Sequence, residues 1–198
     1  MRSIRMAALL GALAAAPALA QGAASHPQTR DGFAISFGVG AGSAGFSCDG
    51  CSSDRGNGGS GYLRIGGAVR PNLVIAGELN GWTKQESGAT GTIGYLTAVA
   101  QWYPAPASGF YLEGGIGGGS VQIDVTDLTT GTTERLESAG VAFQLGTGYD
   151  WRVARNFSLT PYVDFLTTAG GEAKYDGASL NERLDANVFQ FGLGFSWH

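Results

Sequence analysis

Charged residues, cysteines and histidines are all scarce in this sequence. Only 14% of its 198 residues are charged, against about 25% in ordinary soluble domains. Two cysteines are too few for a scaffold built on disulfides or for an all-cysteine zinc site. The formal net charge of −4 argues against nucleic-acid binding, which normally needs a basic patch. The composition thus argues against these classes of protein.

Long hydrophobic runs are missing as well, except near the start. Arg2 and Arg5 precede an apolar stretch at residues 6–16, and small residues at positions 18 and 20 form the pattern that precedes a cleavage site. We therefore predict a cleaved secretory signal peptide over residues 1–20. Beyond it, no stretch reaches the ~18–20 apolar residues that a membrane helix requires.

Apolar residues instead alternate with glycine and other small residues, and glycine accounts for 34 positions. In residues 186–198, Phe189, Phe191, Leu193, Phe195 and Trp197 alternate with Gln190, Gly192, Gly194, Ser196 and His198. A period of two predicts a β-strand with two different faces. A soluble sheet normally turns a polar face to water, whereas a face made mostly of glycine and serine suits the narrow lumen of a barrel better.

Eight segments share this strand character: residues 33–42, 59–69, 73–82, 92–103, 110–125, 136–150, 157–168 and 186–198. The connections between them are alternately short (70–72, 104–109 and 151–156) and long (44–58, 83–91, 126–135 and 169–185). Bacterial outer-membrane barrels have this pattern, with long loops outside the cell and an even number of strands that places both termini in the periplasm. The apolar parity switches across residues 117–119, which predicts a β-bulge there.

The expected fold is therefore all-β: an eight-stranded antiparallel up-and-down transmembrane β-barrel. It occupies residues 32–198 as a single outer-membrane domain, after a short periplasmic segment at residues 21–31. Eight strands enclose a lumen about wide enough for side chains alone, so we expect the interior to be filled.

Strand pairing can be predicted from the polar residues. A hairpin centred on Pro71 places Arg64 opposite Glu78 and Tyr62 opposite Asn80. A second hairpin, centred on residue 153, places Gln144 opposite Tyr162, Ala142 opposite Asp164 and Phe143 opposite Val163. The parity of its segment turns Glu113 inward as well. The predicted polar network of the lumen comprises Arg64, Glu78, Glu113, Tyr62, Asn80, Gln144, Tyr162 and Asp164.

Carboxyl groups outnumber cations in this predicted network. Three carboxyl groups face a single arginine, Arg64, although a lone buried charge is very costly. Either one carboxyl group is protonated, or an arginine of the long loops, such as Arg135 or Arg183, reaches into the lumen.

From residue 21 onward the chain resembles the small eight-stranded outer-membrane barrels, the family that includes the membrane domain of OmpA. The resemblance rests on the signal peptide, the eight alternating strands, the segment Gly148-Tyr149-Asp150 followed by residues 156–162, and the aromatic closing strand. It implies insertion in the outer membrane of a Gram-negative-type envelope, among lipid and lipopolysaccharide. It also leads us to expect no peptidoglycan-binding domain after the barrel.

The resemblance further implies an assembly signal, because the final strand of this family is read by the outer-membrane barrel assembly machinery. The residues in that position here are Phe189, Phe191, Leu193, Phe195 and Trp197. Members of the family usually end in Phe or Trp, whereas in this chain His198 follows Trp197.

Cys48 and Cys51 form a CxxC motif in the first long loop. A thioredoxin-like redox role would need a βαβ context, and a zinc site would need a second Cys/His pair; the sequence has neither. A local disulfide, formed in the oxidising envelope, is the favoured interpretation.

The positions of the histidines argue against catalysis. Some small outer-membrane barrels are enzymes that use a histidine near the outer rim, and a serine nucleophile generally needs an adjacent base. His26 precedes the first strand and His198 ends the last, so both are expected on the periplasmic side. The glycine run at residues 114–119 lacks the lysine of a phosphate-binding loop and is interpreted as relief of crowding in a narrow lumen. We expect no enzyme activity, cofactor or bound metal.

The long loops carry an excess of acidic residues: Asp49, Asp54, Glu86, Asp127, Glu134, Glu172, Asp176, Glu182 and Asp185, against Arg55, Lys84, Arg135, Lys174 and Arg183. Such charge usually marks a solvated face, but an acidic rim can also bind divalent ions that bridge lipopolysaccharide, or an extracellular partner.

Aromatic residues near the strand ends predict an interfacial girdle: Trp82, Trp102, Tyr103, Tyr111, Tyr149, Trp151 and Trp197. Turn packing is the alternative for Trp151.

The sequence favours a structural or surface-interaction protein with a side-chain-filled lumen and no nucleic-acid partner. A narrow channel or passage for small or hydrophobic solutes is the main alternative. A soluble lipocalin-like barrel, with its aromatic faces turned inward around a ligand, is a third interpretation.

Overall fold

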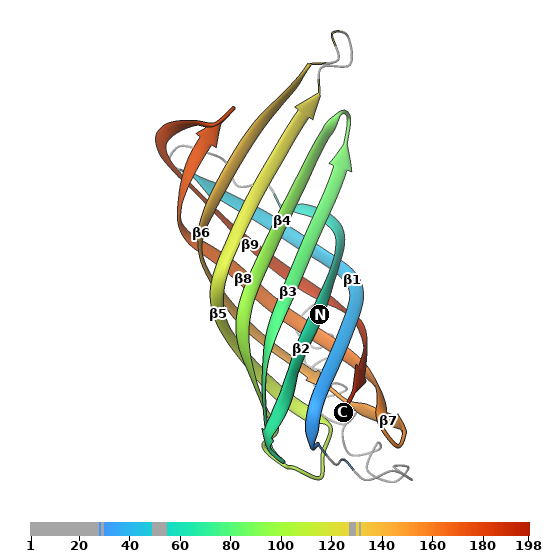
Figure 1. Ribbon diagram of the computed structural model, residues 1–198. Helices are drawn as coiled ribbons and strands as arrows, with labels where there is room; N and C mark the ends of the chain where they lie inside the picture. The colour runs from blue at the N-terminus through green and yellow to red at the C-terminus, as the bar shows by residue number, and fades with distance from the viewer. Residues whose placement is uncertain (1–27, 29, 49–54, 127–129, 131) are drawn as a thin grey trace, which may run out of the picture.

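The computed structural model drawn in Figure 1 describes residues 28, 30–48, 55–126, 130 and 132–198. Its strands are β1 (Gly32–Cys48), β2 (Gly56–Arg70), β3 (Leu73–Glu86), β4 (Ala89–Trp102), β5 (Phe110–Thr126), β6 (Thr133–Tyr149), β7 (Trp151–Ala154), β8 (Phe157–Tyr175) and β9 (Ala178–Trp197). Among the described residues, no helix is long and apolar enough to cross a membrane. The predicted signal peptide lies outside the described residues.

The eight long strands close into one antiparallel barrel. From β1 to β6 each strand pairs with the next in the chain, β8 pairs with β9, and β9 pairs with β1. Pairing of β6 with β8 joins the two remaining edges. The short strand β7 follows β6 and pairs with the start of β8. The predicted eight-stranded antiparallel barrel is confirmed, with all eight predicted strand segments in place.

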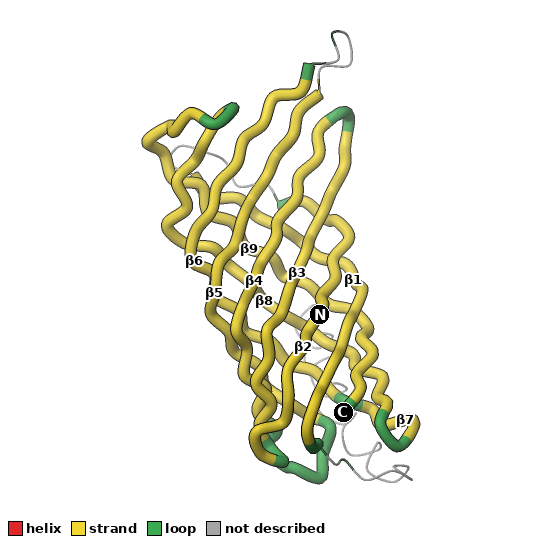
Figure 2. The backbone as a smooth tube through the Cα atoms, in the orientation of Figure 1, coloured by secondary structure: helices red, strands yellow, loops and turns green. Residues whose placement is uncertain are grey.

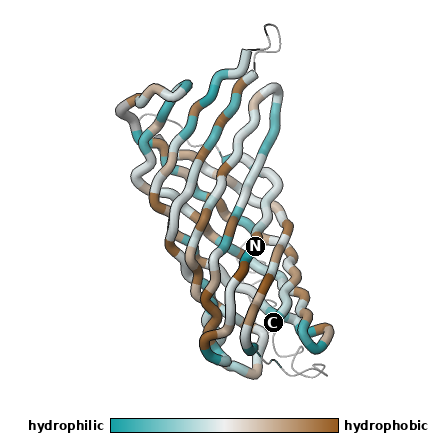
Figure 3. Tube along the Cα trace, in the orientation of Figure 1, coloured by the Kyte–Doolittle hydropathy of each residue, from teal (hydrophilic) through white to brown (hydrophobic). Residues whose placement is uncertain are grey.

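Large apolar side chains cover the outside of the barrel wall. Phe33, Val39 and Leu145 are 65–67% exposed. Hydrophobic positions recur along the wall, and hydrophilic positions are frequent in the upper hairpins (Figure 3). At alternate positions the strands bury polar groups, among them Arg64 and Glu78. This is the distribution of a membrane barrel. It contradicts the lipocalin-like alternative, which would turn the aromatic faces inward.

The barrel has two unlike ends (Figure 1). One end, which we call the base, holds the turn at Pro71, residues 103–109 and the β7 turn. The opposite end, the mouth, is formed by the β3–β4 and β8–β9 turns and by the end of β5 at Thr126 and the start of β6 at Thr133. Arg30 and His198 both lie against Asp150 at the base. The chain therefore enters and leaves the barrel at the same end, as an even number of strands requires.

Two of the predicted long loops are strands instead. The β3–β4 and β8–β9 hairpins end in two-residue turns, Ser87-Gly88 and Asp176-Gly177, whose residues all have positive φ. In Figure 2 the strands of both hairpins run on to short turns at the upper end of the barrel. Above the apolar belt the outer face of a hairpin carries polar residues in place of apolar ones, so the apolar alternation that marks a lipid-facing strand in the sequence is lost. The prediction of loops over residues 83–91 and 169–185 was therefore wrong.

The predicted bulge at residues 117–119 is not present. β5 pairs with β4 and with β6 in continuous register along its whole length. The apolar parity switches because Val121 and Ile123 point into an apolar upper part of the lumen. A register shift occurs instead between β6 and β8 near Ala139 and Val141, where Gly170 of β8 has φ +75°.

The first predicted hairpin register is confirmed and the second is wrong. β2 and β3 pair Arg64 with Glu78 and Tyr62 with Asn80. In the second hairpin, Gln144 pairs with Leu166 rather than Tyr162, Ala142 pairs with Thr168, Phe143 pairs with Thr167, and Asp164 pairs with Gly146. The reason is that residues 151–154 form β7, which moves the turn to Arg155-Asn156. The shift is an even number of residues, so the predicted faces are kept.

Candidate functional site: the filled lumen and its mouth

A network of buried polar side chains fills the middle of the lumen. Arg64 lies at its centre and contacts both Glu78 and Glu113, the latter at 2.6 Å between Nη2 and Oε2. All three side chains are at most 5% exposed. They come from β2, β3 and β5, so a single guanidinium joins three strands of the wall.

Amide side chains complete the network around the carboxylates. Gln144 Nε2 donates to Glu113 Oε1 at 2.7 Å and to Glu78 Oε1 at 2.5 Å, and its own Oε1 accepts from Thr97 at 2.8 Å. Asn80 also donates to Glu78. These bonds use both protons of the Gln144 amide. The carboxylates are thus held by charge-assisted hydrogen bonds from several strands.

Gln190 of β9 connects the network to the third carboxyl group. Its Nε2 donates to Asn80 Oδ1 at 2.7 Å and to Asp164 Oδ2 at 3.2 Å. All eight predicted lumen residues are buried in the interior, but Thr97 and Gln190 were not predicted as members. The alternative that a loop arginine enters the lumen is wrong, because Arg183 is exposed and the Arg135 side chain is 50% exposed. Protonation of one carboxyl group stays a prediction.

Two tyrosines block the lumen next to the polar network. The rings of Tyr62 and Tyr162 meet edge to face with centroids 4.8 Å apart, and the Arg64 guanidinium lies 4.8 Å from the Tyr62 ring. Space for the rings comes from glycine: a Cβ atom at Gly38 would lie 2.9 Å from Tyr162 and closer still to Tyr62. Small residues on the inner face therefore allow large ones opposite.

The upper part of the lumen is apolar. Its buried members are Ala44, Trp82, Ile93, Tyr95, Val121, Ala142, Leu166, Ala173, Leu184, Ala186 and Val188. Gly119 belongs to the same layer, where a Cβ would collide with Thr168 and Tyr95. This placement accords with the interpretation that the glycine run relieves crowding.

The base is closed around Asp150. Its carboxylate accepts from Tyr103 at 2.8 Å and from Thr160 at 2.9 Å, and lies 3.5 Å from His198 Nε2 and 3.9 Å from Arg30 Nε. The Arg30 guanidinium also stacks 3.4 Å over the Tyr103 ring. Burial alone would raise the pKa of Asp150, but its contacts, chiefly with His198, lower the pKa below its usual range. The cluster around Asp150 was not predicted from the sequence, because Arg30 precedes the first strand and was not expected to enter the barrel.

Three of the aromatics assigned to the interfacial girdle line the interior instead. Trp82 is 3% exposed and its indole N–H donates to Gly42 O at 3.0 Å. Tyr103 and Tyr111 are buried with Val74 at the base. A position near a strand end does not determine which face of the sheet a side chain is on. The odd or even position along the strand determines it.

The other predicted girdle residues are accessible from outside. Trp102, Trp151 and Trp197 are exposed and Tyr149 is partly buried. In the last strand, Phe189, Phe191, Leu193 and Trp197 are exposed on the outer face, and Phe195 packs on Phe37 of β1 with centroids 5.4 Å apart. The assembly signal itself stays a prediction.

Two ion pairs form among the described charged residues at the mouth. Lys84 contacts Glu86 at 2.5 Å and Arg135 contacts Asp124 at 2.8 Å. Hydrogen bonds from Lys84 and Arg135 hold the pKa of Glu86 and of Asp124, respectively, below their usual ranges. Within the described residues, no group of three or more His, Cys, Asp or Glu side chains gathers to hold a metal ion.

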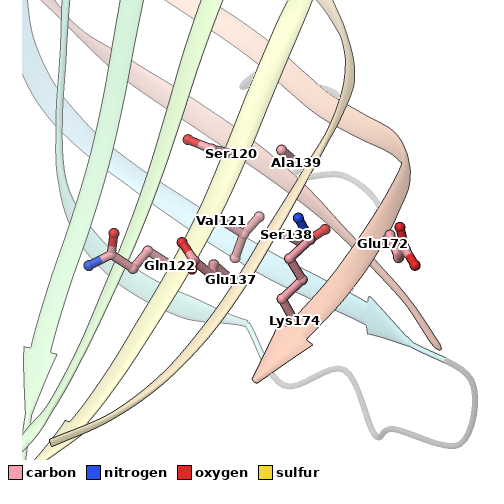
Figure 4. A pocket seen from close by; sticks show the side chains of 8 residues that line it. All are labelled: Ser120, Val121, Gln122, Glu137, Ser138, Ala139, Glu172 and Lys174. Carbon is pink, nitrogen blue, oxygen red and sulfur yellow. The ribbon is translucent and has the colours of Figure 1, made fainter. Parts of the chain in front are cut away.

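A hollow of about 370 Å³ lies beside Arg135 and Asp176 at the mouth, and two more adjoin the apolar upper part of the lumen. One of these two, of about 360 Å³, is lined by Ser120, Val121, Gln122, Glu137, Ser138, Ala139, Glu172 and Lys174 (Figure 4). Glu137 pairs with Gln122 of β5 and with Lys174 of β8, so the lining of this hollow carries charges of both signs. The other, which we call the mouth pocket, measures about 250 Å³ and is lined by Phe46, Arg55, Gly56, Trp82, Lys84, Glu86, Ala89, Gly91 and Ile123.

The predicted Cys48–Cys51 disulfide and His26 lie outside the described residues, as do Asp49, Asp54 and Asp127 of the predicted acidic rim. Among the described residues the histidine is His198, which lies beside Asp150 at the base, the opposite end of the barrel from the mouth. A catalytic histidine near the mouth is therefore not found among the described residues.

The sequence matches a family profile, and the fold resembles those of solved outer-membrane structures. The sequence profile described as "Autotransporter beta-domain" matches residues 77–198. Ail, the attachment invasion locus protein of Yersinia pestis, superposes with a TM-score of 0.56 at 16% identity, covering 84% of this chain and 99% of Ail. Ail in complex with the heparin analogue sucrose octasulfate gives 0.54 at 15% identity, with the same coverage. Neisserial surface protein A gives 0.55 at 14% identity, covering 83% and 96%. No curated protein matches the sequence.

Proposed function

Because this chain belongs to the autotransporter beta-domain family, we propose that it is an integral outer-membrane β-barrel with a closed lumen, acting as a structural or surface-interaction protein. In this proposal residues 1–20 direct export, the base faces the periplasm and the mouth faces the outside of the cell. The apolar belt meets lipid, and the last strand is read by the barrel assembly machinery.

The observation that carries the proposal is the stack of filled layers in the lumen. From base to mouth these are the Asp150 cluster, the Arg64 network, the tyrosine pair and the apolar cluster around Trp82. A hollow between the first two layers measures about 10 Å³, about the minimum that one water molecule needs. Such a lumen leaves no continuous aqueous path in the described part of the barrel.

The proposed surface role is supported by the hairpins that extend beyond the apolar belt. They present exposed charged side chains, such as Glu86, Lys174 and Asp176, at the mouth. Ail, named for attachment and invasion and crystallised with a heparin analogue, has a similar fold. We propose that this chain contacts an extracellular partner through its mouth and that its role is non-enzymatic.

Conductance measurements test the closed lumen. The chain without residues 1–20 is refolded, inserted into planar lipid bilayers and compared with protein-free bilayers and with a large porin. We expect no conductance steps above the protein-free control, because the polar side chains of the lumen bond one another. Insertion is checked by the heat-modifiable mobility of the same sample. Reproducible steps from the folded protein would instead establish the narrow-channel alternative.

A further inference from the structure

We propose that the mouth pocket is a binding site for a small aromatic or short-chain carboxylate. The apolar body of the ligand lies against the wall formed by Phe46, Trp82 and Ile123, and its carboxylate meets Arg55 and Lys84 at the rim. This proposal goes beyond the closed-barrel function and needs no passage through the lumen.

The inner wall of the pocket suits an apolar body. Phe46 packs edge-on against Trp82 with ring centroids 6.4 Å apart, and Ile123 packs partly buried against the same cluster. The Trp82 indole N–H already donates to Gly42 O at 3.0 Å. The remaining wall residues, Ala89 and the two glycines, have no polar side-chain atoms, so a sugar ring would find few partners for its hydroxyl groups there.

The size of the pocket agrees with this ligand class. An apolar cavity of about 150 Å³ accepts benzene, and the mouth pocket measures about 250 Å³. The difference leaves room for a carboxylate and a short linker beside one ring. Small-molecule sites are typically apolar hollows with a few convergent polar groups, and the mouth pocket has this composition.

Two glycines maintain the space beside the indole. A Cβ atom at Gly91 would lie 3.6 Å from Trp82 Cζ3, and one at Gly56 would lie 3.7 Å from Trp82 Cη2 and 3.2 Å from Lys84 Cδ. At Gly91 an added side chain would make ordinary contact with Trp82, whereas at Gly56 the flexible Lys84 side chain would first have to shift by a few tenths of an ångström. In both cases the added side chain would occupy the pocket. Larger residues at these positions would therefore fill the site without breaking the wall.

The rim supplies the preference for an anion. Arg55 and Lys84 stand against a single carboxylate, Glu86, among the lining residues. Arg55 is held by Ser43 and Asn187, with Nε 3.1 Å from Ser43 Oγ and Nη1 2.5 Å from Asn187 Oδ1. Its contacts with Ser43 and Asn187 use three of the five N–H donors of a guanidinium. The Lys84 ammonium contacts Glu86 at 2.5 Å and has three donors, so it can contact a second anion as well. Positioned cationic donors at an apolar pocket favour a carboxylate.

The test titrates phenylacetate into the folded, isotope-labelled barrel and follows the indole N–H resonance of Trp82, identified by its loss in Trp82→Phe. We expect a saturable shift in the wild type and about tenfold weaker binding of the neutral phenylacetamide, the change that loss of a charge-assisted hydrogen bond produces. Gly91→Val should weaken phenylacetate binding at least about tenfold by filling the pocket. Lys84→Gln should weaken it several-fold by removing a rim charge.

Gly81→Val is the matched control, since a Cβ there meets nothing within 4 Å and points away from the pocket. It should bind like the wild type, and every variant must keep heat-modifiable mobility. A shift that does not saturate, or that is equal in Gly91→Val, would overturn the site, and equal affinity for phenylacetamide would overturn its anion preference. These failures leave the conductance of the barrel unchanged, so they are distinct from failure of the closed-lumen proposal.

Discussion

Arg64→Met is expected to lower the free energy of unfolding by about 3–5 kcal/mol, the cost of breaking a buried ion pair and leaving a charge behind. The substitution keeps most of the side-chain volume but leaves Glu78 and Glu113 without the cation that contacts both. Amide donors from Gln144 and Asn80 would remain, yet neither carries charge. Urea unfolding in lipid vesicles, followed by tryptophan fluorescence, measures the change.

A triple variant separates the charge effect from packing. Adding Glu78→Gln and Glu113→Gln to Arg64→Met removes the stranded charges while preserving shape, and neutral replacements of buried ion pairs are often tolerated. We expect the triple variant to recover most of the lost stability. An Arg64→Met barrel that unfolds at the same urea concentration as the wild type would show that the polar network does not hold the lumen together.

Gly117→Val should prevent or severely weaken closure of the barrel. A Cβ atom at Gly117 would collide with the backbone of β4, meeting Leu96 O and lying 2.7 Å from Thr97 Cα. Overpacking usually costs about 1–3 kcal/mol, and here no rotamer change can relieve a clash with backbone. We expect the loss to be at the upper end of this range or beyond, read as a small heat-modifiable fraction after refolding.

The adjacent position provides the control. At Gly118 the nearest atom to an added Cβ is Gly140 O at 4.0 Å, and the residue is on the exposed face of β5. Valine favours extended strands, so Gly118→Val should refold at least as well as the wild type. Equal refolding of the two variants would contradict the assignment of inner and outer faces in β5.

The barrel wall could be predicted from the sequence because lipid imposes a strict alternation. The number of strands, their antiparallel order and the β2–β3 register followed from parity and from the opposed charges of Arg64 and Glu78. Prediction failed where that constraint ends. The β8–β9 hairpin above the belt was taken for a loop, and the β7 turn displaced the second register by an even number of residues.

Contacts across the lumen could not be predicted in the same way. Gln190 was seen to face inward, but its partner Asn80 comes from β3, which is not a neighbour of β9 in the sheet. Such contacts depend on the stagger of the closed barrel, which no single hairpin reveals. Trp82 was placed at the membrane interface because it ends an apolar segment, whereas parity with Glu78 turns it inward.

Fractionation of cells that express the full chain tests the central claim most directly. The membrane fractions are separated by density, and the mobility of the protein is compared with and without boiling. An outer-membrane barrel closed by eight strands should sediment with the outer membrane and migrate differently after boiling, because the wall survives detergent until it is heated. A soluble protein with a single mobility would contradict the account, since Leu145, Val39 and the rest of the exposed apolar belt would then face water.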